Sequence, residues 1–175
     1  MTARRIVDLA SLSAATRDDF VAALGGIFEH TPWIAEGAYA ARPFASVDAL
    51  HRAMVAALAA APPEAKLALI RAHPELAGKE AVAGTLTVDS EAEQSSAGLD
   101  HCTADELTQL RDGNRAYRQK FGFPFVMAVK HCGKREILDA LQARLAGTRG
   151  AEFERCIAEI ETIARLRLIA LLGDG

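Results

Sequence analysis

Residues 151–172 read AEFERCIAEIETIARLRLIALL. Apolar residues recur there at every third or fourth position, the spacing of one face of a helix that turns by about 100° per residue. That face comprises Phe153, Ile157, Ile160, Ile163, Ala164, Leu168 and Leu171. A long helix with a continuous apolar face has to bury that face, so the stretch predicts a helix at the centre of a packed core.

Two arginines near the end of this stretch point in opposite directions. Arg167 lies in the middle of the apolar face, whereas Arg165 lies on the opposite side, which we expect to face solvent. A buried guanidinium has to be paired or to bind an anion, because burying its charge alone is very costly. Arg167 is therefore a candidate to bind a ligand carboxylate, and a buried ion pair with a glutamate explains it equally well.

Helical spacing also dominates the chain before residue 151. Helix starts are expected at Thr16, Ser46, Pro63, Ser90 and Thr103, and helix ends at Pro62, Pro74, Gly122 and Gly147. The segment FPFVMAV at residues 123–129 is the only plausible strand. The sequence therefore predicts an all-α, single-domain helical bundle over residues 1–175, a length that suits one domain.

Composition excludes several classes of partner. Half of the residues are hydrophobic and a quarter are charged, as in an ordinary folded domain. The formal net charge is −3 and the basic residues are scattered, so no nucleic-acid partner is expected. No apolar run reaches the roughly 18 residues of a membrane-spanning helix, so no membrane partner is expected either.

The cysteines and the two ends of the chain bear on location. Cys102, Cys132 and Cys156 are odd in number and form no CxxC motif, which does not resemble a disulfide framework. The N-terminal residues lack the sustained apolar core of a signal peptide. The C-terminus, Leu-Leu-Gly-Asp-Gly, lacks the Ser-Lys-Leu peroxisomal address. We therefore expect a reducing compartment and a cytoplasmic location.

The sequence carries no recognisable cofactor motif. His30, His51, His101 and His131 show neither HExxH spacing nor another zinc signature. No Gly-rich phosphate-binding loop occurs. Neither a metal nor a nucleotide cofactor is expected.

His73 is the strongest candidate for proton transfer. Pro74 should end the preceding helix and push His73 toward an extended conformation. Imidazole exchanges protons near neutral pH and would be held here at a helix end. The alternative is that His73 hydrogen-bonds a carbonyl of the last helical turn or faces water.

Three polar residues further along could act with His73, and each has a structural alternative. Glu93 could orient an imidazole and favour its protonated form, but it also fits the third position of a capping box that starts at Ser90. Gln94 could recognise a ureido group or a ring amide, or simply lie at the surface. Ser90 could bind substrate, although N-capping explains it fully.

Several motifs occur together in a fixed order. They are FEHTPW at 28–33, HPELAGK at 73–79, the segment 90–100 with Glu93-Gln94 and SAGLD, FGFPFV at 121–126 and IARLRL at 163–168. This set resembles the 2-oxo-4-hydroxy-4-carboxy-5-ureidoimidazoline (OHCU) decarboxylase family over nearly the whole chain. The resemblance implies an all-helical fold of that type, a homodimer, conversion of OHCU to (S)-allantoin and carbon dioxide in uric acid degradation, and no metal or organic cofactor.

The resemblance also implies roles for single residues. The family's catalytic histidine corresponds to His73 and its partner carboxylate to Glu93. The positions expected to bind substrate are Pro74, Ser90, Gln94, the backbone of Phe125, Val126 and Met127, and Arg167. One position departs from the family, which commonly has glycine after Ala128-Val129-Lys130, where this chain has His131.

Two rival functions remain open at this point. The first is a non-catalytic helical module that binds a small molecule, and it predicts no turnover. The second is a hydrolase of a ureido compound that uses His73 and Glu93 to activate water. Its product would retain the carboxylate that a decarboxylase removes.

Overall fold

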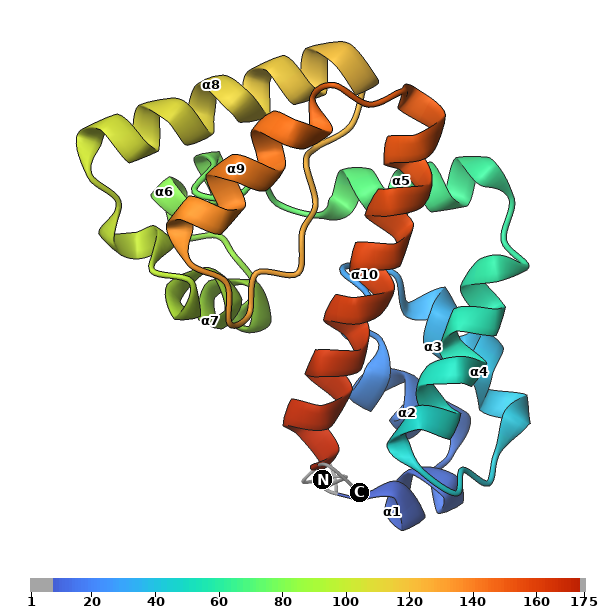
Figure 1. The fold of residues 1–175 in the computed structure, drawn as a ribbon. Coiled ribbons are helices and arrows are strands. Elements are labelled where there is room, and N and C mark those ends of the chain that lie inside the picture. Colours follow the sequence, from blue (N-terminus) through green and yellow to red (C-terminus); the bar gives the residue numbers. More distant parts are fainter. Residues whose placement is uncertain (1–7, 174–175) are drawn as a thin grey trace. The chain divides into compact units, whose positions relative to one another are not determined.

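The structure is a computed structural model that describes residues 8–173, and all regular elements in that range are helices (Figure 1). The α-helices are α1 (Leu9–Ala14), α2 (Arg17–Leu24), α3 (Pro32–Ala38), α4 (Val47–Ala59), α5 (Pro63–Ala72), α6 (Lys79–Ala83), α7 (Val88–Ser96), α8 (Ala104–Phe121), α9 (Lys134–Arg144) and α10 (Arg149–Leu172). Two 3₁₀-helices, η1 (Tyr39–Ala41) and η2 (Leu99–His101), accompany them. The all-α prediction is confirmed.

The chain divides into two compact units. The first combines residues up to 69 with residues from 161 onward, and the second comprises residues 70–160. The expectation of a single domain over 1–175 stays a prediction. The chain ends, on which the expectations about a signal peptide and a peroxisomal address rest, include residues 1–7 and 174–175, which lie outside the described range.

In the first unit, α2, α3 and α4 pack in sequence order (Figure 1). Thr16 and Ser46 cap α2 and α4 as expected, each accepting a hydrogen bond from a backbone N–H of the first turn. The ring of Phe20 is fully buried and contacts Tyr39 and Phe44. The helix expected to start at Thr16 ends at Leu24.

In the second unit, α8 packs against α9 (Figure 1). Gly113 of α8 faces Leu141 of α9, and a Cβ atom at position 113 would overlap the Leu141 side chain. The capping box at the start of α8 is confirmed. The Glu106 N–H donates to Thr103 Oγ1 at 3.2 Å, and the Thr103 N–H donates to Glu106 Oε2 at 2.8 Å.

The predicted helix start at Ser90 is wrong, because α7 begins two residues earlier. Thr87 is the N-cap, and its hydroxyl accepts the Ser90 N–H at 3.3 Å. Ser90 therefore lies inside the first turn with a buried side chain. Glu93 does not occupy a capping box, so the structural alternative that competed with its catalytic role does not apply.

The predicted strand at 123–129 is also wrong. The segment has no regular secondary structure and pairs with no strand among the described residues, and a strand needs such a partner for its backbone groups. Side chains take that place. Arg144 donates to the Val126 carbonyl at 2.8 Å, and Glu159 accepts the Ala128 N–H at 2.9 Å.

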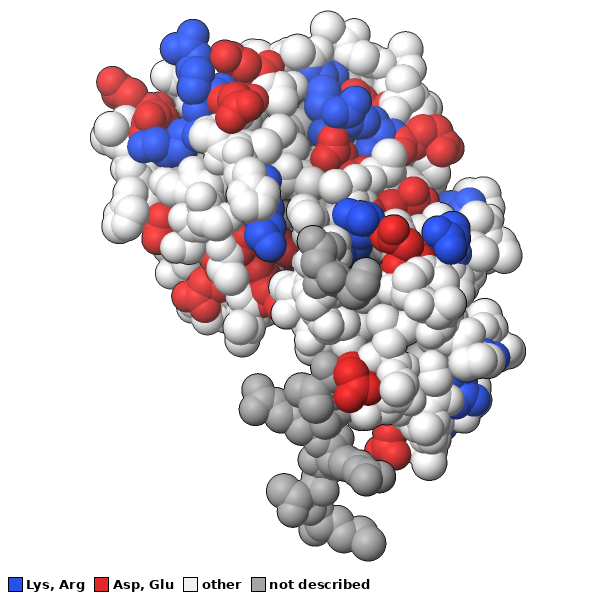
Figure 2. Space-filling model, turned by 60° about the horizontal axis from the view of Figure 1, so that its bottom comes forward, with Lys and Arg blue, Asp and Glu red and all other residues white. Residues whose placement is uncertain are grey.

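No single helix among the described residues is both long and apolar enough to cross a membrane, although the bent pair of α4 and α5 passes the same test together. On the face that Figure 2 shows, basic and acidic side chains of the described residues are interspersed. This arrangement agrees with the scattered charges of the sequence.

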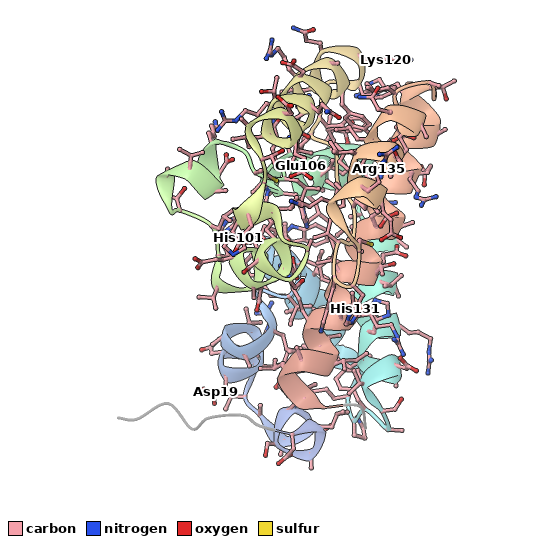
Figure 3. All side chains as sticks on the ribbon, turned by 60° about the vertical axis from the view of Figure 1, so that its left-hand side comes forward. Asp19, His101, Glu106, Lys120, His131 and Arg135 are labelled. Carbon is pink, nitrogen blue, oxygen red and sulfur yellow. The ribbon has the colours of Figure 1, made fainter. Side chains whose placement is uncertain are left out.

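His131, which Figure 3 labels, stands where the family commonly has glycine. Its backbone is left-handed, with φ of +71°. A non-glycine residue pays a conformational cost there. We expect His131→Gly to raise the free energy of unfolding by about 0.5–1 kcal/mol, measured by urea denaturation. The neighbouring Lys130→Gly, at a residue without positive φ, is the control and should lower that energy. Stabilisation by both changes, or by neither, would contradict this explanation.

Candidate active site

His73 follows the last residue of α5 and is buried, with 6% of its surface exposed. Its backbone N–H donates to the Ile70 carbonyl at 3.2 Å, which closes the helix end. Pro74 follows, half-buried, and ends the helix as the sequence predicts. The alternative of a water-facing histidine is therefore excluded. The buried imidazole of His73 is the first component of a candidate site in the second unit.

The turn after His73 is held by an amide clamp, which we define as the Leu76–Ala77 peptide with the side chains of Gln94 and Asn114. The Ala77 N–H donates to Gln94 Oε1 at 2.9 Å. On the other side of the same peptide, Asn114 Nδ2 donates to the Leu76 carbonyl at 3.0 Å. All four residues are buried. Helices α7 and α8 thus fix one peptide plane of the turn from both sides.

The backbone of this turn is strained where the clamp holds it. Ala77 has a φ of +48°, a conformation that residues with a Cβ atom rarely adopt. At Gly78, a Cβ atom would lie 2.7 Å from Cβ of Glu75, so only glycine fits. Glu75 is in turn paired with Arg118 of α8 at 2.8 Å. Strain that the surroundings enforce is common at functional sites.

Helix α7 places the remaining candidates of this unit on one side. Ser90, Glu93 and Gln94 are three and four positions apart, which is the spacing of one helix face. Ser90 and Gln94 are buried and Glu93 is half-buried. Because the Ala77 N–H occupies the Gln94 carbonyl oxygen, the other end of that amide is an NH₂ group, a donor. The clamp therefore joins the turn that carries His73 to the helix that carries Glu93.

Sequence reasoning missed Asn114. It lies on the apolar face of α8 with Leu110, Tyr117 and Phe121, and a polar residue on such a face was the available signal. We expect Asn114→Leu to lower the free energy of unfolding by about 1–3 kcal/mol, because the Leu76 carbonyl loses its donor, and to lower kcat/KM further than the fraction unfolded explains. Urea denaturation and steady-state assay check this. Gln109→Leu, on the exposed side of α8, is the control.

A cavity of about 400 Å³ lies beside this region, lined among others by Ala77, Leu86, Glu91, Gln94, Leu99 and Arg111. It touches two members of the amide clamp. His73, Ser90 and Glu93 do not line it. Of the three candidates on α7, Gln94 alone borders the cavity, and we do not assign the reaction to it.

The segment expected to contact substrate through its backbone, Phe125 to Met127, also belongs to the second unit. Phe125 and Val126 are buried and Met127 is half-buried. The Val126 carbonyl accepts a hydrogen bond from Arg144, whose Nε also pairs with Glu152 at 2.7 Å. Sequence reasoning identified the segment but not the charged pair beneath it.

Arg167 lies in the first unit and is buried as its helix face predicts, with 4% of its side chain exposed. It pairs with Glu29 Oε2 at 2.7 Å, and the Glu29 side chain is 2% exposed. Arg165 is exposed and pairs with Asp48 at 3.0 Å. The structure thus confirms the assignment of faces and also contains the buried ion pair that was the alternative for Arg167. Binding of substrate by Arg167 stays a prediction.

No group of three or more His, Cys, Asp and Glu side chains among the described residues is arranged to hold a metal ion. The His73 turn and the Ser90–Gln94 face, which the Ala77–Gln94 hydrogen bond joins, carry an imidazole, a carboxylate and an amide. These are groups that move protons and donate hydrogen bonds.

Comparison with known proteins agrees with these motifs. The family model described as OHCU decarboxylase matches residues 13–169. A Haloferax volcanii protein named 2-oxo-4-hydroxy-4-carboxy-5-ureidoimidazoline decarboxylase is 44% identical, over 86% of this chain and 88% of that protein. The Mus musculus protein of the same name is 34% identical, over 95% of this chain and 94% of that protein.

Among solved structures, a crystal structure of (S)-allantoin synthase superposes with a TM-score of 0.76 at 28% sequence identity. The match covers 95% of this chain and 54% of that one. The family model matches most of this sequence, and the alignments with the two named relatives cover most of the length of those proteins. On this evidence the chain belongs to the OHCU decarboxylase family.

Proposed function

We propose that this protein decarboxylates OHCU to (S)-allantoin and carbon dioxide in uric acid degradation. The observation that carries the proposal is the amide clamp, which joins the turn of buried His73 to the α7 face of Ser90, Glu93 and Gln94. Two of these residues, His73 and Glu93, correspond to the catalytic pair of the family. The names of relatives that match over most of this chain support the same reaction.

The reaction requires the protein to position the substrate and to control proton transfer. Carbon dioxide leaves when the bond between the ring carbon and the carboxylate breaks, and the electron pair passes into the substrate's conjugated carbonyl–imine system. His73, oriented by Glu93, exchanges a proton with the hydroxyl group or the adjacent ring atom. Protonation from one face would set the S configuration.

Binding groups hold the substrate during these steps. Arg167 and backbone amides of the segment from Phe125 to Met127 hold its anionic, urea-like periphery. Arg167 supplies the positive charge of this set, and Glu29 pairs with it at 2.7 Å. The resemblance to the family also assigns substrate binding to Pro74, Ser90 and Gln94. The active protein is expected to be a cytoplasmic homodimer, which sedimentation analysis and cell fractionation can test.

The experiment generates OHCU in situ from urate with purified upstream enzymes, then follows carbon dioxide release and allantoin chirality with and without this protein. Faster, enantioselective formation of (S)-allantoin is the expected result. Repeating the assay with a chelator tests whether a metal takes part. A product that keeps the carboxylate would favour the hydrolase, and no acceleration by folded protein would favour the binding module.

Glu93→Gln tests the proposed carboxylate directly. We expect kcat to fall by about 100-fold because a neutral amide does not stabilise a protonated imidazole. The free energy of unfolding should change by less than about 1 kcal/mol, since Glu93 does not cap α7. Steady-state kinetics and thermal denaturation measure the two quantities. Glu91→Gln, the same change at an exposed position of α7, should leave both unchanged. Retained activity with lost stability would make Glu93 structural.

A further inference from the structure

A buried charged network lies beneath the segment from Phe125 to Met127, and the proposed reaction does not use it. We call it the Arg144 cluster: Arg144, Glu152, Tyr117 and Cys156. Arg144 and Glu152 form an ion pair of 2.7 Å with side chains only 11% and 8% exposed. The Tyr117 hydroxyl donates to Glu152 Oε2 at 2.5 Å and lies 3.5 Å from Cys156 Sγ.

The environment locks the protonation states of this cluster. Burial, and then the hydrogen bond to Glu152, raise the pKa of Tyr117. Burial also raises the pKa of Cys156. Burial lowers the pKa of Arg144, but the hydrogen bond to Glu152 and the surrounding groups raise it overall. A buried ion pair contributes little net stability compared with apolar packing, so this arrangement needs another explanation.

The cluster contacts three successive residues, two in the segment and Pro124 just before it. Arg144 Nη1 donates to the Val126 carbonyl at 2.8 Å, and the guanidinium carbon lies 4.6 Å from the centre of the Phe125 ring. Cys156 Sγ lies 4.0 Å from the Pro124 carbonyl oxygen. One residue beyond Met127, the Ala128 N–H is held by Glu159 at 2.9 Å. Met127 is thus flanked by two fixed backbone groups.

The geometry of the peptide bond then determines where the Met127 N–H points. Among the described residues the cis peptide bond is Arg42–Pro43, so the Val126–Met127 bond is trans. In a planar trans peptide the C=O and the following N–H point in opposite directions. Because the Val126 carbonyl points at Arg144, the Met127 N–H points away from the cluster.

We propose that the Arg144 cluster aims the Met127 N–H at an oxygen atom of the bound substrate. Arg144 is then a positioning residue, which acts through the Val126 carbonyl and does not touch substrate. The inference rests on the proposed function, since it needs substrate at this segment. The positioning role also explains why the Arg144–Glu152 ion pair is buried here. A guanidinium presents its donors in a rigid planar fork, so it can hold a carbonyl and a carboxylate in fixed geometry.

Selective labelling makes the test sharp, because the chain has three methionines. In protein labelled with ¹⁵N-methionine, the Met127 amide signal is assigned by its loss in Met127→Leu. Titration with (S)-allantoin, the product of the proposed reaction, should shift the Met127 amide proton downfield as it donates a hydrogen bond. Met54, buried in α4, is the internal reference. An unchanged Met127 signal at saturating allantoin would overturn the inference.

Arg144→Lys tests the positioning step. Lysine keeps the charge beside Glu152 but cannot also hold the Val126 carbonyl in a fork. We expect kcat/KM to fall by about 10- to 100-fold and the allantoin-induced shift of Met127 to shrink. Arg135→Lys, the same change at an exposed position of α9 (Figure 3), and Ile137→Val, a small core loss on α9, should keep both near wild type.

The outcomes separate this inference from the proposed function. If wild-type protein does not convert OHCU, the proposed function fails. If wild type is active and folded Arg144→Lys keeps both its kcat/KM and its Met127 shift, only the positioning role fails. Should Arg144→Lys not fold, Glu152→Gln takes its place, because it removes the carboxylate that orients Arg144. Full activity of that variant would equally overturn the positioning role.

Discussion

His73→Asn is expected to lower kcat by about 10²- to 10⁴-fold, the contribution typical of a positioned proton-transfer group. Asparagine keeps a polar side chain of similar size but cannot exchange a proton near neutral pH. Because the side chain is buried, the assay is paired with circular dichroism and thermal denaturation to show that the variant is folded.

The matched control is His101→Asn, which makes the same change at an exposed histidine in η2 (Figure 3). It should leave kcat and KM unchanged. If folded His73→Asn also kept near-native turnover, His73 would not be the proton-transfer group, whatever its burial suggests. The enantiomeric excess of the allantoin product is a second readout, because it reports which face of the substrate is protonated. Residual product from His73→Asn should be closer to racemic than the wild-type product.

Arg167→Met should have the largest effect on stability. The change removes the guanidinium that pairs with the buried Glu29 carboxylate, and breaking a buried pair from one side typically costs about 3–5 kcal/mol. Urea denaturation measures that loss. The exposed neighbour offers a matched control: Arg165→Met, which removes a surface pair with Asp48, should cost less than about 1 kcal/mol.

The double variant Glu29→Gln/Arg167→Met distinguishes the two explanations of Arg167. Removing both charges should restore most of the lost stability, because the buried carboxylate is removed together with the guanidinium. If Arg167 also binds substrate, the double variant stays defective, with a raised KM. A double variant that regains both stability and native KM would reduce Arg167 to a structural ion pair.

Local sequence signals predicted helix ends and faces correctly where no second residue of the same type competed for the position. Pro74 ended a helix, Thr103 and Glu106 formed a capping box, and the face of Arg167 followed from periodicity. At the start of α7 two hydroxyls compete, three residues apart. Ser90 has a glutamate at the matching third position, yet Thr87 is the cap. Local spacing cannot show that Ser90 is needed inside the unit, where its side chain is buried.

The missed residues act across long separations in the sequence. Asn114 binds a carbonyl 38 residues earlier, and Arg144 binds one 18 residues earlier. No periodicity within one helix predicts such pairs. The strand prediction for residues 123–129 was wrong for the same reason. Its aromatic and branched residues suit a strand, but its backbone partners are the side chains of Arg144 and Glu159.

The amide clamp on the Leu76–Ala77 peptide consists of neutral groups. Carboxamides and peptide groups neither gain nor lose protons across the range in which enzymes work, and hydrogen bonds between them respond weakly to dissolved salt. These two hydrogen bonds on the Leu76–Ala77 peptide are therefore insulated from acidity and ionic strength, unlike the Glu75–Arg118 ion pair of the same turn. A pH–rate profile of this protein should consequently carry no contribution from the clamp.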